Sequence, residues 1–187
     1  MTIIDELKIC IVDNNHDFAH ALENAFINVP NVDVAERSIE DFYEEHKDEI
    51  DCLVSPANAF GHMTGGYDAG LSDILGWDFQ LEVQDYIRKY YYGEQPIGSS
   101  FIIDTPIKGV RLIHTPTMRY PSVIKDPEVV YHCMRSTLIC ALENDVHCIV
   151  IPVFGGKCGK IAPQTAAKWM KEAYLQIAKR KGPAYEI

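Results

Sequence analysis

Short apolar runs alternate with segments of helical period along most of the chain, and this alternation limits the possible folds more than any other feature. The runs are continuous, as expected for strands covered on both faces. Expected strands cover residues 8–12, 32–35, 52–54, 100–104, 111–114 and 148–152. Expected helices cover residues 17–26, 39–46, 78–91, 127–143 and 163–179. The pattern predicts an α/β fold, in which a sheet carries helices on both sides.

Two of these helices carry further signals. Asp126 followed by Pro127 is typical of a helix start, with the acid as N-cap and the proline in the first turn. The last helix has an apolar stripe that is expected to face the core. The stripe consists of Ala166, Trp169, Met170, Ala173 and Ile177.

Length and composition favour one domain. The chain has 187 residues, of which 47% are hydrophobic, so it can form a core without disulfides or a structural metal. Short connections and the lack of a linker predict a single domain over residues 1–187, with a tail at about 181–187 that frays. No apolar run reaches the roughly 18 residues of a membrane span, and the first residues lack signal-peptide features. We expect no membrane contact.

The cysteines indicate a reducing compartment and therefore a cytoplasmic protein. They are scattered, mostly inside apolar runs, and they form no C-x-x-C pair and no cluster with zinc-ligand spacing. We expect free buried thiols, no metal and no cofactor. The six are Cys10, Cys52, Cys133, Cys140, Cys148 and Cys158.

The formal net charge of −10 argues against a nucleic-acid polymer as partner, because such binding depends on many Lys and Arg contacts to phosphate. A single small anion is still compatible with an acidic chain. Backbone N–H groups can hold it without cationic side chains.

Two glycine-rich stretches follow expected strands and precede expected helices. The first, VSPANAFGHMTGGYDAGL, covers residues 54–71, and its helix is expected to begin near Tyr67. The second, IPVFGGKCGKIAP, covers residues 151–163. Glycines let backbone approach a ligand closely, and a following helix adds its dipole, so each loop suits a phosphate. Two such loops at the carboxyl edge of a sheet predict a cradle for a diphosphate.

Neither loop matches the common nucleotide-binding motifs. The spacing from Gly156 to Gly159 is too short for G-x-x-x-x-G-K-[ST], and G-x-G-x-x-G is also absent. A flexible turn between strand and helix is the alternative interpretation of either loop taken alone.

The strand-end SPAN, the following GGYDAGL, the IHTPTMR segment and IPVFGGKCG together resemble the macrodomain family of ADP-ribose-binding modules, in a form similar to bacterial and phage-type members. The resemblance extends from about residue 32 to 179. It implies a three-layer α/β/α sandwich with a mixed, mostly parallel central sheet. It also implies ADP-ribose or a related nucleotide as ligand, with an ADP-ribosylated protein as a possible partner.

The resemblance assigns roles to individual residues. Asn58 matches the asparagine that holds the distal ribose, and Asp68 matches the acid that positions or activates water at the anomeric carbon. These two are the expected catalytic residues. The residues expected to bind ligand are Ile39, Asn58, Gly65, Gly66, Tyr67, Gly155, Gly156, Lys157, Cys158 and Gly159.

Two positions depart from the family pattern. Cys158 stands where an aromatic residue often packs against the ribose, and Ser38 replaces the adenine-binding aspartate before Ile39. Glu40 is a candidate substitute for that aspartate.

Several of these residues also have purely structural interpretations. Asn58 is typical of turns, and Asp68 in a first helical turn complements the helix dipole. Cys158 near Lys157 is a candidate thiolate nucleophile, and His62 and His114 are candidate general bases. Residues 90–92, three tyrosines, provide either a base-stacking surface or packing. Arg119 binds an anion or fixes its loop.

Three functions are compatible with the sequence. The first is hydrolysis of an ADP-ribose linkage in a mono-ADP-ribosyl protein, O-acetyl-ADP-ribose or ADP-ribose 1″-phosphate. The second is a reader that binds ADP-ribose without turnover. The third is a receiver-like signalling domain, suggested by KICIVDNN, although Ser55 stands where that class needs a phosphoacceptor aspartate.

Overall fold

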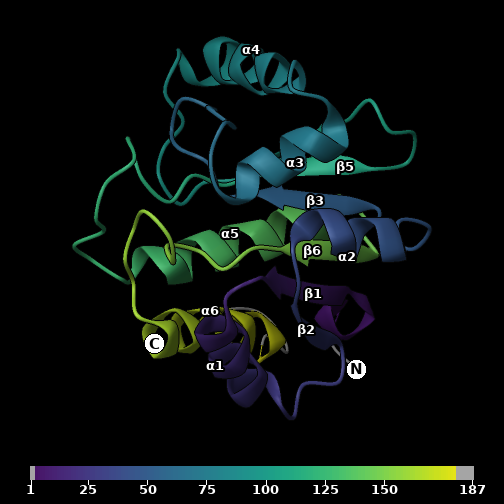
Figure 1. Ribbon diagram of the computed structural model, residues 1–187, viewed down its shortest axis with the longest axis vertical. Helices are drawn as coiled ribbons and strands as arrows, with labels where there is room; N and C mark the ends of the chain where they lie inside the picture. Colours follow the sequence, from purple (N-terminus) through teal and green to yellow (C-terminus); the bar gives the residue numbers. More distant parts are fainter. Residues whose placement is uncertain (1–2, 180–187) are drawn as a thin grey trace, which may run out of the picture.

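The computed structural model describes residues 3–179 and shows one six-stranded sheet with the order β2-β1-β6-β3-β5-β4. In Figure 1, the strands labelled β5, β3, β6, β1 and β2 lie one below another in this order. Every neighbouring pair is parallel except β4 and β5. The strands are β1 Lys8–Asp13, β2 Val32–Glu36, β3 Cys52–Ser55, β4 Phe101–Asp104, β5 Arg111–His114 and β6 Cys148–Ile151.

Within residues 3–179, six α-helices and one 3₁₀ helix cover the two faces of the sheet. Apolar residues from α1, α5, α6 and η1 pack on one face, against Ile9 and Ile149 among others. Residues from α2, α3 and α4 pack on the other face, against Leu53 and Leu112. The elements are η1 Ile3–Glu6, α1 His16–Phe26, α2 Ile39–His46, α3 Tyr67–Leu75, α4 Phe79–Tyr91, α5 Val129–Glu143 and α6 Pro163–Ala178.

The two faces follow from the period of two along each strand. In β1, Ile9 and Ile11 point to the α1 side, whereas Cys10 and Val12 point to the α3 side. Both sets are buried, which explains why the strands are continuous apolar runs. The expected three-layer α/β/α fold with a mixed, mostly parallel sheet is therefore confirmed.

Most expected elements lie within one or two residues of the observed ones, and α3 begins at Tyr67 as expected. The start predicted for α5 is wrong. The helix begins at Val129, and Asp126 lies before it, where its Oδ1 accepts the Glu128 N–H at 3.0 Å. An Asx turn therefore forms at the position where an N-cap was expected.

The stripe expected on α6 faces the core with one change. Ala166, Met170 and Ala173 are buried, and Tyr174 joins them, while Trp169 and Ile177 pack partly buried at the margin. The expected fraying of residues 181–187 concerns a segment outside the described residues. Between residues 3 and 179, none of the helices is long and apolar enough to cross a membrane.

The five parallel strands end at the same edge of the sheet, and the segments that follow them form the site described next. All six cysteines are free thiols, as expected. The expectation that they are buried is wrong for Cys158, which is exposed in the loop after β6, and Cys140 is only partly buried.

Candidate functional site

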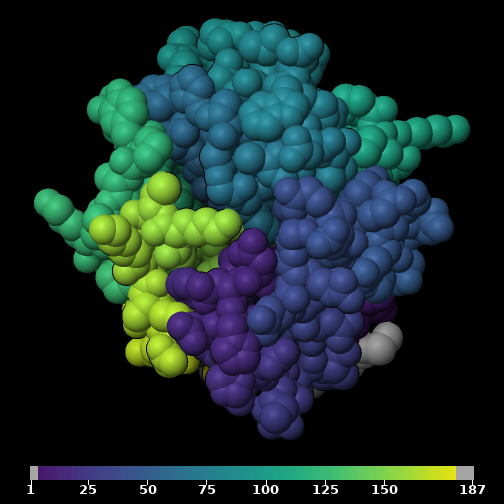
Figure 2. Space-filling model, in the orientation of Figure 1, coloured from purple at the N-terminus to yellow at the C-terminus, as the bar shows by residue number. Residues whose placement is uncertain are grey.

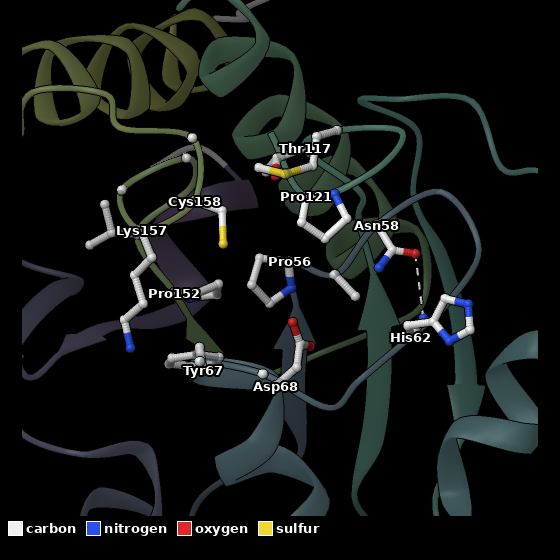
Figure 3. A pocket seen from close by; sticks show the side chains of 18 of the residues that line it. Pro56, Asn58, His62, Tyr67, Asp68, Thr117, Pro121, Pro152, Lys157 and Cys158 are labelled. Atoms are coloured by element: carbon white, nitrogen blue, oxygen red, sulfur yellow. Dashed lines mark hydrogen bonds between the residues drawn. The ribbon is translucent and has the colours of Figure 1, made fainter. Parts of the chain in front are cut away.

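A cavity of about 410 Å³ lies at the carboxyl edge of the sheet, between the two glycine-rich loops. Its walls come from the loop after β3, the start of α3, the loop after β5 and the loop after β6. Figure 3 shows the labelled side chains arranged around this hollow, with Cys158 above and Asp68 below. The two glycine-rich loops, which the sequence predicts to form one cradle, therefore lie around one cavity.

The first loop turns into α3 through Gly66, which is the N-cap residue and has φ of 59°. This left-handed conformation favours glycine. No side chain caps α3, so none of its own capping residues occupies the N–H groups of the first turn. The helix start at the cavity wall suits an anion.

Packing within the protein, and not only access for a ligand, favours glycine at several positions of the second loop. Gly155 has φ of 78°, and a Cβ on Gly156 would lie 2.9 Å from Cζ of Phe18. A Cβ on Gly159 would lie 2.5 Å from the Gly155 carbonyl oxygen. The loop is folded tightly on itself and against α1, which fixes the position of its backbone.

Asp68 lies in the first turn of α3, is 7% exposed and lines the cavity. The Ser55 hydroxyl at the end of β3 donates to its Oδ1 at 2.5 Å. Burial raises the pKa of Asp68 to about 7, although the Ser55 hydrogen bond and the charge of Lys157 oppose the shift. A carboxyl that titrates near neutral pH inside a cavity is suited to proton transfer.

Asn58 fixes a turn and also directs a hydrogen-bond donor into the cavity. Its Oδ1 accepts the Phe60 N–H at 3.0 Å and the His62 N–H at 3.5 Å, as a turn residue does. Its Nδ2 points into the cavity in Figure 3. The amide oxygen thus fixes the turn and leaves the amide nitrogen available as a donor.

The loop after β5 forms the wall opposite Asp68, through Thr117, Met118 and Pro121. Arg119 of this loop does not line the cavity. Its guanidinium donates to both carboxylate oxygens of Glu94, at 2.6 and 3.0 Å. Of its two interpretations, the loop-fixing ion pair is the one that the structure shows.

The two candidate histidines occupy different environments. His62 lines the cavity, and its Nδ1 is 3.3 Å from Nε2 of Gln84. His114 is fully buried outside the cavity lining, with Nδ1 2.5 Å from Oε1 of Gln95. Burial lowers the pKa of His114 to about 3, so it stays neutral and is not a base for the cavity.

The tyrosines at residues 90–92 lie away from the cavity at the end of α4. Tyr91 packs near Phe101 with ring centroids 6.0 Å apart, and Tyr92 is 97% exposed.

Cys158 lines the cavity with an exposed thiol, which Figure 3 shows directed toward the hollow.

A smaller cavity of about 110 Å³ adjoins the first on the β2 side. Ile39 and Glu40 line it, as the resemblance expects for a base-binding region. Ser38 lines it too, but its Oγ accepts the Asp41 N–H at 3.1 Å and so caps α2. Four residues line both cavities: Asp13, Gly66, Tyr67 and Lys157.

All ten expected ligand-binding residues therefore line one of the two cavities. Sequence reasoning missed Asp13, at the end of β1, and Ser55. Asp13 is 9% exposed, accepts the Asn15 N–H at 2.8 Å, and has its pKa raised by burial. A polar residue at a strand's carboxyl end was the available signal for both, but the position of β1 in the sheet was needed to use it.

No metal site is apparent in the part of the chain that the structure describes. Across residues 3–179, no group of three or more His, Cys, Asp or Glu side chains is arranged to hold a metal ion.

Similar folds occur among solved structures, whereas no curated protein sequence matches the chain. The macrodomain of Mycobacterium tuberculosis DarG is 17% identical with a TM-score of 0.58, over 69% of this chain and 84% of that one. The Oceanobacillus iheyensis macrodomain with ADP is 20% identical with a TM-score of 0.58, over 68% of each chain. The macrodomain of Thermus aquaticus DarG is 21% identical with a TM-score of 0.54, over 66% of this chain and 81% of that one. At these identities the likeness concerns the fold.

The sequence itself carries the family assignment. The sequence model of the family described as "Macro domain" matches residues 54–170. This segment is more than half of the chain and includes both glycine-rich loops. The fold, the paired loops and this match agree with the expected resemblance. The chain belongs to the Macro domain family.

Proposed function

We propose that the protein binds ADP-ribose in the paired cavities and hydrolyses a linkage at the distal ribose. The observation that carries the proposal is the buried Asp68 carboxyl, which lines a cavity between two glycine-rich loops together with Asn58. Solved macrodomains with ADP and with ADPR support the choice of ligand.

The ligand runs along the carboxyl edge of the sheet. The diphosphate lies between the glycines of the two loops, where backbone N–H groups and the start of α3 favour negative charge. The distal ribose lies beside Asn58 and Asp68. The nucleobase enters the smaller cavity, against Ile39 and Glu40.

Asp68 acts on the attacking water. As a carboxylate, it accepts a proton from a water molecule whose oxygen forms a bond to C1″ of the distal ribose. The bond between C1″ and the acceptor group breaks, and the acceptor leaves with its electron pair. It then takes a proton, so the products are ADP-ribose and the free acceptor. A mono-ADP-ribosyl protein and ADP-ribose 1″-phosphate carry such a bond at C1″. In O-acetyl-ADP-ribose the acetyl ester is on a ribose hydroxyl, so the water attacks the acetyl carbonyl carbon instead, the bond from that carbon to the ribose oxygen breaks, and the products are acetate and ADP-ribose.

The test is the variant Asp68→Asn, assayed for release of ADP-ribose and for ADP-ribose binding. We expect turnover to fall by at least about 100-fold, because a positioned general base contributes this much or more. Binding should remain within about threefold, because the amide keeps the shape of the side chain. Asp73→Asn, on the same helix but exposed and outside both cavities, is the matched control and should behave as wild type.

A reader of ADP-ribosylated protein is the second candidate function. It is favoured by Cys158, a small side chain at the position where many family members have an aromatic ring. Calorimetry with ADP-ribose together with a product assay separates the two functions. Binding without product from any of the three substrates supports the reader, and product that persists in Asp68→Asn removes this residue from the mechanism.

A further inference from the structure

Lys157 lies where the two cavities meet. It belongs to the loop after β6, lines both cavities and is exposed. In Figure 3 its side chain runs from that loop, past Pro152, to the level of Tyr67. In the space-filling view of Figure 2, the yellow-green atoms of this loop border both the purple early chain and the blue-to-teal atoms of the first loop and α3. The lysine is thus at the junction of three chain segments.

The side chain of Lys157 lies over the turn at Gly66. A Cβ built on Gly66 would lie 3.4 Å from Cδ of Lys157 and 4.0 Å from its Nζ. The ammonium is therefore beside the backbone of the first loop, at the start of α3. Lys157 and Gly66 line both cavities, so a ligand that extends from the larger cavity into the smaller one lies beside this side chain.

The charges around this junction leave the ammonium available for a ligand. Among the described residues, Lys157 is the one Lys or Arg that lines the larger cavity, and Asp13 and Asp68 are the acids that line it. The positive charge of Lys157 lowers the pKa of both acids, although burial raises each one overall. Within residues 3–179, no ion pair or side-chain hydrogen bond fixes its ammonium.

The diphosphate of ADP-ribose carries two negative charges, and Asp13 and Asp68 in their carboxylate forms oppose its entry. Backbone N–H groups and the start of α3 favour negative charge, and a positively charged side chain beside them offsets the repulsion further. We propose that Lys157 binds the diphosphate through its ammonium at the junction of the two cavities. This inference rests on the proposed function, since it requires a nucleotide that spans both cavities.

The role differs from that of the glycines in a measurable way. A lysine acts as a point charge, so its contribution grows with the charge of the ligand and falls as salt screens it. Backbone N–H groups are retained in any variant of the side chain. A change at Lys157 should therefore affect ADP more than AMP, and more at low salt than at high salt.

The experiment is calorimetry of wild type, Lys157→Gln, Lys157→Arg and Lys160→Gln with ADP and AMP, at low and high salt. We expect Lys157→Gln to weaken ADP binding about tenfold at low salt, as the loss of one charge-assisted contact does. The loss should be smaller for AMP and should shrink at high salt. Lys157→Arg keeps the charge and should bind within about threefold of wild type.

Lys160→Gln is the matched control, because Lys160 is exposed in the same loop and lines neither cavity. It should bind ADP as wild type does. ADP affinity of Lys157→Gln within about twofold of wild type at low salt overturns the inference. An equal loss for ADP and AMP with a lowered Tm overturns it too, since that indicates a damaged loop. If wild type itself binds neither nucleotide, the proposed function fails as well, and that outcome is distinct from the other two.

Discussion

Asp68 shows how one buried carboxyl links the proposed chemistry to the stability of the fold. The residue is 7% exposed, and burial raises its pKa to about 7, whereas a carboxyl in the unfolded chain titrates near 4. Between these two values, the folded protein holds a proton that the unfolded chain has released. Folding stability therefore falls as the pH rises from about 4 to about 7, and the cost persists above pH 7.

Asp68→Asn removes this cost, because its side chain does not ionise. We expect its Tm to exceed that of wild type by several degrees at pH 8, with the difference closing toward pH 4, where both side chains are neutral. Thermal unfolding of both proteins across this pH range measures the difference. A constant difference in Tm at every pH would mean that the pKa of Asp68 does not change on folding.

At the residue level, the sequence predicted that Asn58 and Asp68 lie at one site, and the structure brings both to the cavity wall. The signals were local: Asn58 closely follows the end of β3, and Asp68 follows the glycines at the start of α3. Prediction failed for Ser55, whose hydroxyl bonds to Asp68 across 13 residues of sequence. It also failed for Asp13, because the place of β1 in the sheet, which brings this residue to the cavity, was not predicted. Gly156 lies between these cases: its position in a loop was evident, but its contact with Phe18 of α1 was not.

At the scale of elements, α2 and α3 approach each other closely at Gly70. Gly70 is buried inside α3, and a Cβ there would lie 2.5 Å from Cγ2 of Ile39 and 2.7 Å from Oε1 of Glu40. Ile39 and Glu40 line the smaller cavity, so this close approach of the helices brings that cavity next to the larger one.

Gly70→Ala tests the contact. Alanine favours a helix interior by about 1 kcal/mol over glycine, but here overpacking should outweigh this gain and lower stability by about 1–3 kcal/mol. Denaturant unfolding measures the change. Gly65→Ala is the control, since a Cβ at that position meets no atom within 4 Å. Gly70→Ala at least as stable as wild type would show that the helices separate easily.

The elements themselves were largely predictable, because continuous apolar runs and helical stripes are local signals. Their ends were less so. α5 begins two residues after its expected start, since Asp126 bonds the Glu128 N–H in a turn instead of capping the helix. Such choices depend on competition between local hydrogen bonds, which residue types alone do not decide.

At the scale of the whole molecule, the strand order determines which residues meet at the site. β1 lies between β2 and β6, with Ile9 opposite both Val32 and Ile149. The sequence predicted an α/β sheet but not this order, because pairings across long sequence separations leave no local signal. The family match begins at residue 54, yet Asp13, Ile39 and Glu40 line the cavities from the segment before it.

The central claim is that the hollow between the two glycine loops receives ADP-ribose. Cys158 reports on it directly, because its thiol is exposed and lines the hollow, whereas Cys140 is partly buried and the other four cysteines are buried. The decisive measurement is the alkylation rate of Cys158 with iodoacetamide, followed by mass spectrometry, with and without saturating ADP-ribose. Occupancy of the hollow predicts a rate at least about tenfold slower with the nucleotide. An unchanged rate would contradict the account.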